Sequence, residues 1–226
     1  MIPTFKKSDN LYQKIYTYLK TQILRNEIKA GETVNETKLA EAFETSRSPV
    51  RDALKMLESE GYLVQAGNSK VVSGFNWNDI DNLVEIRESL ELMVFDLAIK
   101  NLDSEDLNNL ETIINEMKKT DESDIYGLII LDIKFHNYFV KVSENNLLNS
   151  LLSSFYDNLI RATMLSVFRS NWNKDTNINY HSDILTLLRE KKYDKARQKL
   201  KTHIEIWENS INEAKLNLQH LETSEN

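Results

Sequence analysis

The sequence predicts a mostly α-helical protein of two domains: a winged helix-turn-helix in residues 1–75 and an antiparallel bundle of six helices in residues 76–226. Both prolines and four of the five glycines lie in residues 1–75, so turn signals are frequent only there. Later residues repeat apolar positions at helical spacing. The charge changes at the same boundary: residues 1–75 hold 11 Lys and Arg against 9 Asp and Glu, whereas the whole chain carries a net charge of −7.

The composition excludes several kinds of protein. The chain has no cysteine, which excludes a disulfide framework, a cysteine-ligated zinc site and a cysteine nucleophile. Its first residues resemble neither a signal peptide nor a lipidation motif, and no apolar run is long enough to cross a membrane. We therefore expect a soluble, cytoplasmic protein with no membrane partner.

Three helices are expected in the front domain. The first spans residues 10–28, whose apolar side chains share one face. Asn35 is a favourable N-cap for the second helix, and Ser46 for the third. Pro49 fits the first turn of the third helix, where a missing N–H removes no helical hydrogen bond. Two β-prone runs then flank a polar turn at residues 66–69, and three helices followed by such a hairpin form a winged helix.

The start of the third helix is suited to DNA. Arg47 and Arg51 are four residues apart and project from one face, beside the hydroxyl of Ser46 and the free N–H groups of the helix end. Such a helix end can bind phosphates and contact base edges in a major groove. The hairpin tip, with Asn68 and Lys70, would lie beside the adjacent minor groove or backbone. The alternatives are a capped helix pair with solvated arginines and a purely structural hairpin.

The front domain resembles the GntR family of bacterial transcription regulators, on the residues Gly31…Asn35-Glu36…Leu39-Ala40…Ser46-Arg47-x-Pro49-Val50-Arg51-x-Ala53-Leu54…Leu57…Glu60-Gly61…Val71-Val72. The resemblance implies that Ser46, Arg47 and Arg51 contact double-stranded operator DNA, with help from the wing tip. We also include Asn35 and Thr37 among the expected DNA-contacting residues. Many members carry an arginine at the position of Thr37, so we expect a weaker contact there.

Six helices are expected in the back domain, because apolar residues recur at i, i+3, i+4 and i+7 and few residues interrupt them. The segment from Asp103 to Asp106 is a typical helix start, with acidic residues in the first turn. The expected ranges are about 80–98, 103–119, 123–143, 147–169, 175–190 and 193–218.

Three histidines of the back domain lie inside predicted helices. Asp132 precedes His136 by four residues on one helix face, which makes the pair a natural half-site for a divalent metal ion. His181 and His203 lie in two other helices, and their imidazoles would complete the site. The alternative is that these histidines are hydrogen-bonded core or surface residues.

The back domain resembles the FCD ligand domain of the FadR subfamily, on Arg87-x-x-Leu90-Glu91, Asp132-x-x-Phe135-His136, Ser143-x-Asn145-x-Leu147, His181-x-x-Ile184 and Ala196…His203-Ile204. In the metal-binding branch of that domain an aspartate and three histidines hold the ion, which implies as ligands Asp132, His136, His181 and His203. Zinc is the first expectation, with nickel, manganese or iron as alternatives. The residue before His181 is commonly glutamate and is Tyr180 here, which changes a neighbour of that ligand.

A site of three imidazoles and one carboxylate leaves positions open on a six-coordinate ion, where a small organic acid would fit. Arg87 and Arg161 are the candidates for binding the far end of such an effector, because a guanidinium binds a carboxylate through two hydrogen bonds. Ordinary ion pairs are the alternative for both arginines.

These features predict a ligand-responsive, DNA-binding transcription regulator that binds a roughly palindromic operator as a homodimer. The resemblance implies a repressor. A metal sensor is an alternative, in which the ion itself is the signal. A metal-dependent hydrolase is a further alternative, but no carboxylate or histidine beside the ligand set stands out as a general base, so we do not expect an enzyme.

Overall fold

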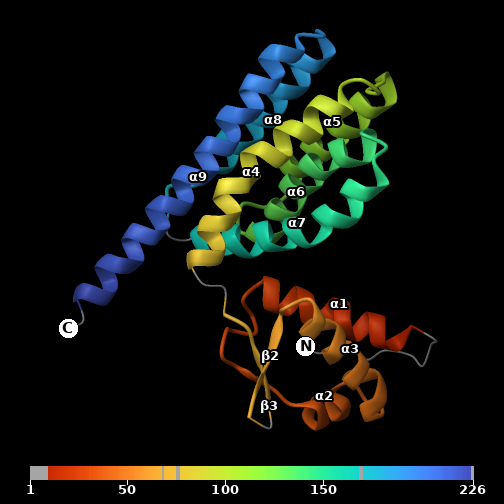
Figure 1. Ribbon diagram of the computed structural model, residues 1–226, viewed down its shortest axis with the longest axis vertical. Coiled ribbons are helices and arrows are strands. Elements are labelled where there is room, and N and C mark those ends of the chain that lie inside the picture. The colour runs from red at the N-terminus through yellow and green to blue at the C-terminus, as the bar shows by residue number, and fades with distance from the viewer. Residues whose placement is uncertain (1–9, 68, 75–76, 168–169, 225–226) are drawn as a thin grey trace. The chain divides into compact units, whose positions relative to one another are not determined.

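The computed structural model describes residues 10–67, 69–74, 77–167 and 170–224 (Figure 1). Contacts within the chain group into two compact units, Met1–Phe75 and Asn76–Asn226. The described chain is mostly helical, as the sequence predicts, and each unit has its own apolar core. No helix within these ranges combines the length and the apolar character needed to cross a membrane.

The first unit is a winged helix. Its elements are, in order, α1 (Leu11–Leu24), β1 (Thr33–Val34), α2 (Glu36–Ala42), α3 (Arg47–Ser59), β2 (Leu63–Ala66) and β3 (Ser69–Val72). The strands form an antiparallel sheet in the order β1-β3-β2, with Leu63 opposite Val72 and Thr33 opposite Val71. The sequence predicts the hairpin but not β1, because two residues are too few to show an alternating pattern.

The core of the first unit lies between α1 and α3. Ile15 and Leu19 of α1 and Leu54 and Leu57 of α3 are buried, at the helical spacing of each segment. This packing fixes the position of α3 and leaves its opposite face exposed along the first two turns. The exposed face is the one that carries the predicted DNA-contacting residues.

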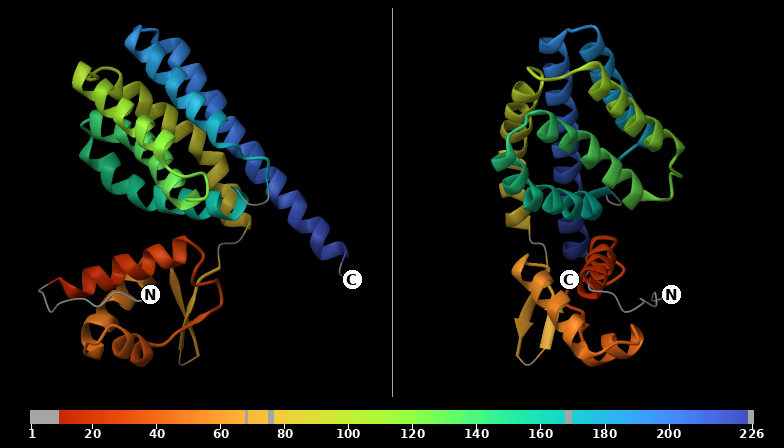
Figure 2. Two further views of the ribbon diagram at one scale, coloured as in Figure 1. Left: turned by 180° about the vertical axis from the view of Figure 1, so that it is seen from behind. Right: turned by 90° about the vertical axis from the view of Figure 1, so that its right-hand side faces the viewer.

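Among the described residues, the second unit is a bundle of six helices: α4 (Trp77–Ala98), α5 (Ser104–Lys119), α6 (Ile125–Val142), α7 (Asn146–Ser166), α8 (Lys174–Arg189) and α9 (Tyr193–Ser224). Helix α6 packs against α4, α5 and α7, and α9 packs against α4, α7 and α8. Figure 2 shows the long α9 beside α4 and α8. These contacts bring α6 close to the consecutive helices α8 and α9, from which it is distant in sequence, around one interior.

Side-chain caps explain why most of these helices begin where the sequence predicts. The side chains of Asp103, Asp124, Asn145 and Asn173 accept hydrogen bonds from backbone N–H groups at the starts of α5, α6, α7 and α8. The helix ends differ more. Helix α9 continues to Ser224, beyond the expected end at 218, whereas α7 ends at Ser166, before the expected end at 169. Positions 168 and 169 lie outside the described residues.

Candidate functional site

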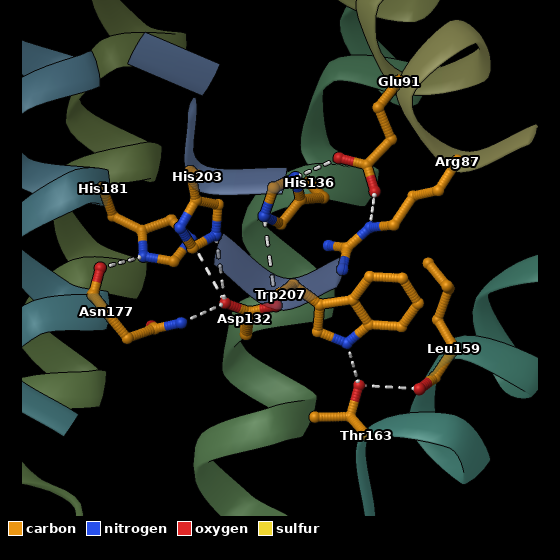
Figure 3. A network of polar contacts seen from close by, with 10 residues as sticks. All are labelled: Arg87, Glu91, Asp132, His136, Leu159, Thr163, Asn177, His181, His203 and Trp207. Atoms are coloured by element: carbon orange, nitrogen blue, oxygen red, sulfur yellow. Dashed lines mark hydrogen bonds and ion pairs between the residues drawn. The ribbon is translucent and has the colours of Figure 1, made fainter. Parts of the chain in front are cut away.

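Four polar side chains meet in the core of the second unit (Figure 3). Asp132 and His136 come from α6, His181 from α8 and His203 from α9, and their donor atoms all lie within 4.8 Å of one another. The three imidazoles are buried, whereas the Asp132 side chain keeps an exposed fraction of 18%. The structure thus brings together the four residues that were predicted as metal ligands.

The local sequence directs these imidazoles inward, because each occupies the core face of its helix. His181 lies between the buried Ile178 and Ile184, three residues from each. His203 follows the buried Leu200 by three residues. An apolar residue at such a position would simply pack, whereas an imidazole there requires polar partners.

Two contacts fix the orientation of the imidazoles. The Nδ1 atom of His181 lies 2.9 Å from the backbone carbonyl oxygen of Asn177, and Nδ1 of His136 contacts the carboxylate of Glu91. Carbonyl and carboxylate oxygens accept hydrogen bonds, so both histidines carry a proton on Nδ1. Their Nε2 atoms face Asp132, at 3.3 Å from Oδ1 for His181 and 3.9 Å from Oδ2 for His136.

The chemistry of this cluster fits a divalent metal ion. The Nε2 atoms of His136 and His181 are buried and have no hydrogen-bond partner among the described residues, although buried polar atoms almost always have one. Donors bound to one ion at about 2.1 Å lie at most roughly 4.2 Å apart. Because the donor atoms already lie within 4.8 Å, small side-chain shifts are enough for all four to bind the same ion.

Burial and neighbouring groups favour the protonation states that metal ligands require. Burial lowers the pKa of His181 well below its ordinary value, and the neighbouring His203 lowers it further. Burial likewise lowers the pKa of His203. Burial alone would raise the pKa of Asp132, but the hydrogen bond with His203 and the other nearby imidazoles outweigh it, so this pKa lies well below its ordinary value. The imidazoles of His181 and His203 are therefore neutral near pH 7, and the carboxylate is ionised.

A second buried carboxylate joins this cluster to Arg87. Glu91 lies one turn after Arg87 on α4, accepts a hydrogen bond from its Nε at 2.7 Å, and contacts Nδ1 of His136. Burial would raise the pKa of Glu91, but the neighbouring Arg87 and His136 lower it to about 2. The sequence alone did not indicate a role for Glu91, although its spacing of four residues from Arg87 is the signal of an ion pair.

A cavity of about 110 Å³ adjoins the cluster. Asp132 and His203 line it together with Arg87, whose guanidinium lies 4.2 Å from the centre of the Trp207 ring. Trp207 is held in turn by a hydrogen bond of 2.8 Å from its Nε1 to Thr163. Within the described chain, the terminal nitrogens of Arg87 make no hydrogen bond or ion pair, so they remain available to a ligand.

The rest of the cavity wall is mostly uncharged. Arg87 is the only Lys or Arg among the described residues that line it, and Asp132 is the only Asp or Glu. Ser166, Thr176 and other residues with hydroxyl groups line the wall. The Oγ atom of Ser170 is buried there without a hydrogen-bond partner in the described ranges. The wall therefore offers hydrogen bonds but few additional charges to a bound molecule.

Arg161, the other predicted effector-binding arginine, is not among the residues that line this cavity. It lies on α7, and the lining residues of that helix are Thr163 and Ser166. A separation of two residues turns a side chain by roughly 200° around a helix axis, so Arg161 and Thr163 project from nearly opposite sides. The geometry therefore supports Arg87 and not Arg161 as the arginine of the cavity.

In the first unit, the two predicted DNA-contacting arginines share one carboxylate. Arg47 donates from Nε to Glu36 at 3.0 Å, and Arg51 donates from Nε and Nη2 to the same carboxylate at 3.1 and 2.8 Å. The arginine side chains remain exposed, with exposed fractions of 60% for Arg47 and 53% for Arg51. The sequence alone did not indicate this contact, because Glu36 lies on a different helix and no periodicity links it to α3.

The residues that begin α2 and α3 occupy exposed positions. Ser46 is exposed at the N-cap of α3 and its side chain makes no cap hydrogen bond, so its hydroxyl is not committed to the helix. Asn35 caps α2 by accepting a hydrogen bond of 3.0 Å from a backbone N–H three residues later. Thr37 is exposed in the first turn of α2. These three residues thus lie at the helix starts, as the sequence predicts.

The wing contributes one described residue to the predicted DNA surface. Lys70 lies on β3 and forms an ion pair with Glu58 of α3. Its ammonium is therefore partly neutralised by a residue of the unit itself. Asn68, the other predicted wing residue, lies outside the described residues.

Two family models match the chain. Residues 11–71 match the model described as bacterial regulatory proteins, gntR family, and residues 82–206 match the FCD domain. The first span contains the winged helix up to β3, and the second contains all four members of the buried cluster together with Arg87 and Glu91.

Individual proteins give the same result. The HTH-type transcriptional regulator YdhC of Bacillus subtilis is 32% identical over 198 residues, which cover 85% of this chain and 87% of that protein. The gluconate operon transcriptional repressor of Bacillus licheniformis is 33% identical over 127 residues, which cover 54% of this chain and 51% of the repressor. The solved structure of E. coli McbR/YncC superposes with a TM-score of 0.74 at 23% identity, over 92% of this chain and 98% of that chain, and shows a shared fold.

Proposed function

Because this chain belongs to the gntR family of bacterial regulatory proteins and carries an FCD domain, we propose that this DNA-binding transcription regulator responds to a small, hydroxylated monocarboxylate. The observation that carries the proposal is the cavity of the second unit, which Arg87 lines together with the buried cluster of Asp132 and three histidines. The relatives are transcriptional regulators and the chain is not an enzyme, so the hydrolase considered from the sequence is excluded.

The proposed response includes a divalent metal ion. Asp132, His136, His181 and His203 would hold it, and when bound it would supply a Lewis-acidic position for the carboxylate of the effector. Zinc is the first candidate for ligands of this kind, with nickel, manganese or iron as alternatives. The support is that Glu91 and the carbonyl of Asn177 already hold two imidazoles with Nε2 toward the shared space.

The charges around the cavity favour a ligand with one negative charge. The positive charges of Arg87 and a divalent ion are only partly neutralised by the carboxylates of Glu91 and Asp132. One positive charge is left to be balanced by the ligand. An uncompensated charge is costly in a buried site. The terminal nitrogens of Arg87 are suited to the same carboxylate that would meet the ion. A monocarboxylate therefore fits this site better than a dicarboxylate or a neutral molecule.

The uncharged wall favours hydroxyl groups on the remainder of the effector. Hydroxyl and amide side chains can both donate and accept hydrogen bonds, and the buried hydroxyl of Ser170 has no partner among the described residues. A purely aliphatic tail would leave the Ser170 hydroxyl unsatisfied. Trp172 and Trp207 also line the cavity, and aromatic side chains can contact the C–H groups of the same molecule.

Helix α4 connects this cavity to the winged helix along the chain. It carries Arg87 and Glu91 and begins at Trp77, two residues after Phe75, the last residue of the first unit. An effector that binds Arg87 therefore acts on the helix that leads into the DNA-binding unit. A difference in effector affinity between the DNA-bound and free states of about 1–3 kcal/mol would be typical of such coupling.

We further propose that the protein binds its operator as a homodimer and represses transcription. Two-fold symmetry in a regulator matches two half-sites in a roughly palindromic operator. The name of one relative, a gluconate operon transcriptional repressor, supports the negative role. The remaining alternative is a metal sensor, whose operator affinity would follow the free metal concentration without any organic acid.

The proposal is tested by the thermal stability of the protein with matched small acids. Glycerate and gluconate represent hydroxylated monocarboxylates, propionate and hexanoate lack the hydroxyls, and tartronate and glucarate have a second carboxylate. We expect one of the first pair to raise the melting temperature most, because a ligand at 100 times its dissociation constant stabilises by about 2.7 kcal/mol. The rise should disappear with a chelator.

Two arginine variants provide the matched control for this experiment. Arg87→Gln should abolish the ligand-dependent rise, measured against the variant's own melting temperature, whereas Arg161→Gln, outside the cavity lining, should retain it. Equal rises with hexanoate and gluconate would contradict the hydroxylated class. A rise that persists in Arg87→Gln would remove this cavity from the proposal.

A further inference from the structure

We propose that Glu36 is a positioning residue of the DNA-contacting surface. It orients the guanidinium groups of Arg47 and Arg51 for base contacts and reduces the affinity of this surface for non-specific DNA. The inference rests on the prediction that these two arginines contact DNA, and it is independent of the metal ion, the effector and the cavity.

The first support is the geometry of the contact. Glu36 is the first residue of α2, and its carboxylate receives three hydrogen bonds from two residues of α3. Arg47 uses only its Nε, and Arg51 uses Nε and Nη2. In the described chain, both terminal nitrogens of Arg47 and Nη1 of Arg51 make no further hydrogen bond or ion pair. Glu36 therefore binds each guanidinium on the side that carries Nε and leaves N–H groups of the terminal nitrogens exposed.

The second support is the charge arrangement. Arg47 and Arg51 are one helical turn apart, and two like charges at that spacing repel each other. A single carboxylate between them offsets the repulsion and restricts two otherwise flexible side chains before DNA arrives. The hydrogen bond from Arg51, with a further one from Arg47, lowers the pKa of the Glu36 carboxyl below its ordinary value, so it stays ionised at neutral pH.

This arrangement has two consequences for DNA binding. Terminal guanidinium nitrogens bind O6 and N7 of guanine as a pair, so pre-oriented arginines lose less conformational entropy when they read a base. The carboxylate also removes part of the positive charge that attracts phosphates regardless of sequence. Both effects increase the ratio of operator affinity to non-specific affinity.

Glu36 is not required to start its own helix. Asn35 already caps α2 through the hydrogen bond to the backbone N–H of Lys38. The Glu36 side chain is partly exposed and lies outside the apolar core. Substitutions at Glu36 should therefore leave the winged helix folded, so that DNA binding can be measured directly.

The test requires a DNA probe. It is obtained from a random duplex library by selecting the duplexes that the full-length wild-type protein binds. The most enriched duplex serves as operator, and a scrambled duplex of equal composition serves as non-specific DNA. Dissociation constants for both are measured by fluorescence anisotropy at several salt concentrations. The variants are Glu36→Asp, which keeps the charge but is too short to reach both arginines, and Glu36→Gln, which keeps the length but removes the charge.

We expect Glu36→Asp to weaken operator binding about tenfold, the cost of disturbing one base contact, without changing scrambled-DNA binding. Glu36→Gln should tighten scrambled-DNA binding and steepen its salt dependence. Glu41→Gln is the matched control, because Glu41 is exposed on the same helix and forms no ion pair among the described residues. It removes one charge and should leave the affinity ratio unchanged.

Two further results would overturn the inference, and they are distinguishable. If Arg47→Ala weakens the selected operator but both Glu36 variants keep the wild-type ratio of affinities, Glu36 has no positioning role. If Arg47→Ala itself binds the operator like the wild type, the underlying assignment of the DNA surface is wrong. Circular dichroism melts of every variant separate these results from loss of folding, which would weaken both duplexes together.

Discussion

Single residues decide the chemistry of the second unit, because charged side chains occupy core positions that apolar side chains usually fill. The Glu91 carboxylate both anchors Arg87 at the cavity and sets the proton of His136 on Nδ1. Replacing a buried polar network with well-packed apolar residues is often neutral or stabilising. A network of this kind is therefore better explained by ligand binding than by stability. The Nε2 atoms of His136 and His181, which have no hydrogen-bond partner in the described part of the chain, support the same interpretation.

At this scale we predict the effect of two ligand substitutions on metal content. Protein purified without added ions or a histidine tag should contain about one metal ion per chain, and Asp132→Ala and His181→Ala should lose it, because the affinity of such a site falls with each donor removed. Elemental analysis measures the content. Asp183→Ala is the control, since Asp183 is on α8 but pairs with Lys199 at 2.7 Å. Equal metal content in all four proteins would contradict the ligand assignment.

The positions at which helices begin are determined largely by local chemistry at the helix ends. Helix α5 is the clearest example: the Asp103 side chain accepts a hydrogen bond from the backbone N–H of Asp106 at 2.8 Å, and the Asp106 side chain accepts one from the backbone N–H of Asp103 at 3.1 Å. The acidic segment that predicts this helix start is thus a reciprocal cap. By contrast, β1 exists only because Thr33 and Val34 pair with β3, and no local signal reveals that pairing.

The cap of α5 leads to a prediction about stability. Asp103→Ala should lower the free energy of unfolding of the second unit by about 1 kcal/mol, because one helical N–H loses its partner. Urea denaturation followed by circular dichroism measures this difference. Glu105→Ala is the control, since it removes a carboxylate from the same turn without a cap bond and should cost only about 0.3 kcal/mol. Equal costs for the two variants would show that charge, and not the cap, stabilises this helix start.

At the scale of the whole molecule, each unit has a separate core and a separate chemistry. The first presents arginines on the exposed face of α3, and the second encloses a polar cluster and a cavity. The family models divide in the same way, with residues 11–71 and 82–206 matched separately. In a regulator with two separate sites, the sites are coupled only by the free energy with which ligand binding at one changes binding at the other.

Separate cores predict two unfolding transitions. Leu54→Ala removes a buried side chain from the first unit and should destabilise that unit by about 2–5 kcal/mol. Leu110→Ala should do the same in the second unit, where Leu110 is buried on α5. Differential scanning calorimetry should show each variant shifting a different transition, and a chelator shifting only the one that Leu110→Ala shifts. A single transition moved by both variants would show that the chain unfolds as one unit.

The sequence by itself determined the fold class and the order of the helices, because periodicity and capping residues are local properties of the chain. It paired Asp132 with His136 through their spacing on one helix, whereas His181 and His203 joined that set through the family resemblance. Only the tertiary structure decided which side chains meet. It joined Glu36 to two arginines of another helix and Glu91 to His136, and it placed Arg87 at the cavity while Arg161 lies outside the lining. Such contacts depend on how helices rotate and pack against one another, and the spacing of residues along one helix does not determine that rotation.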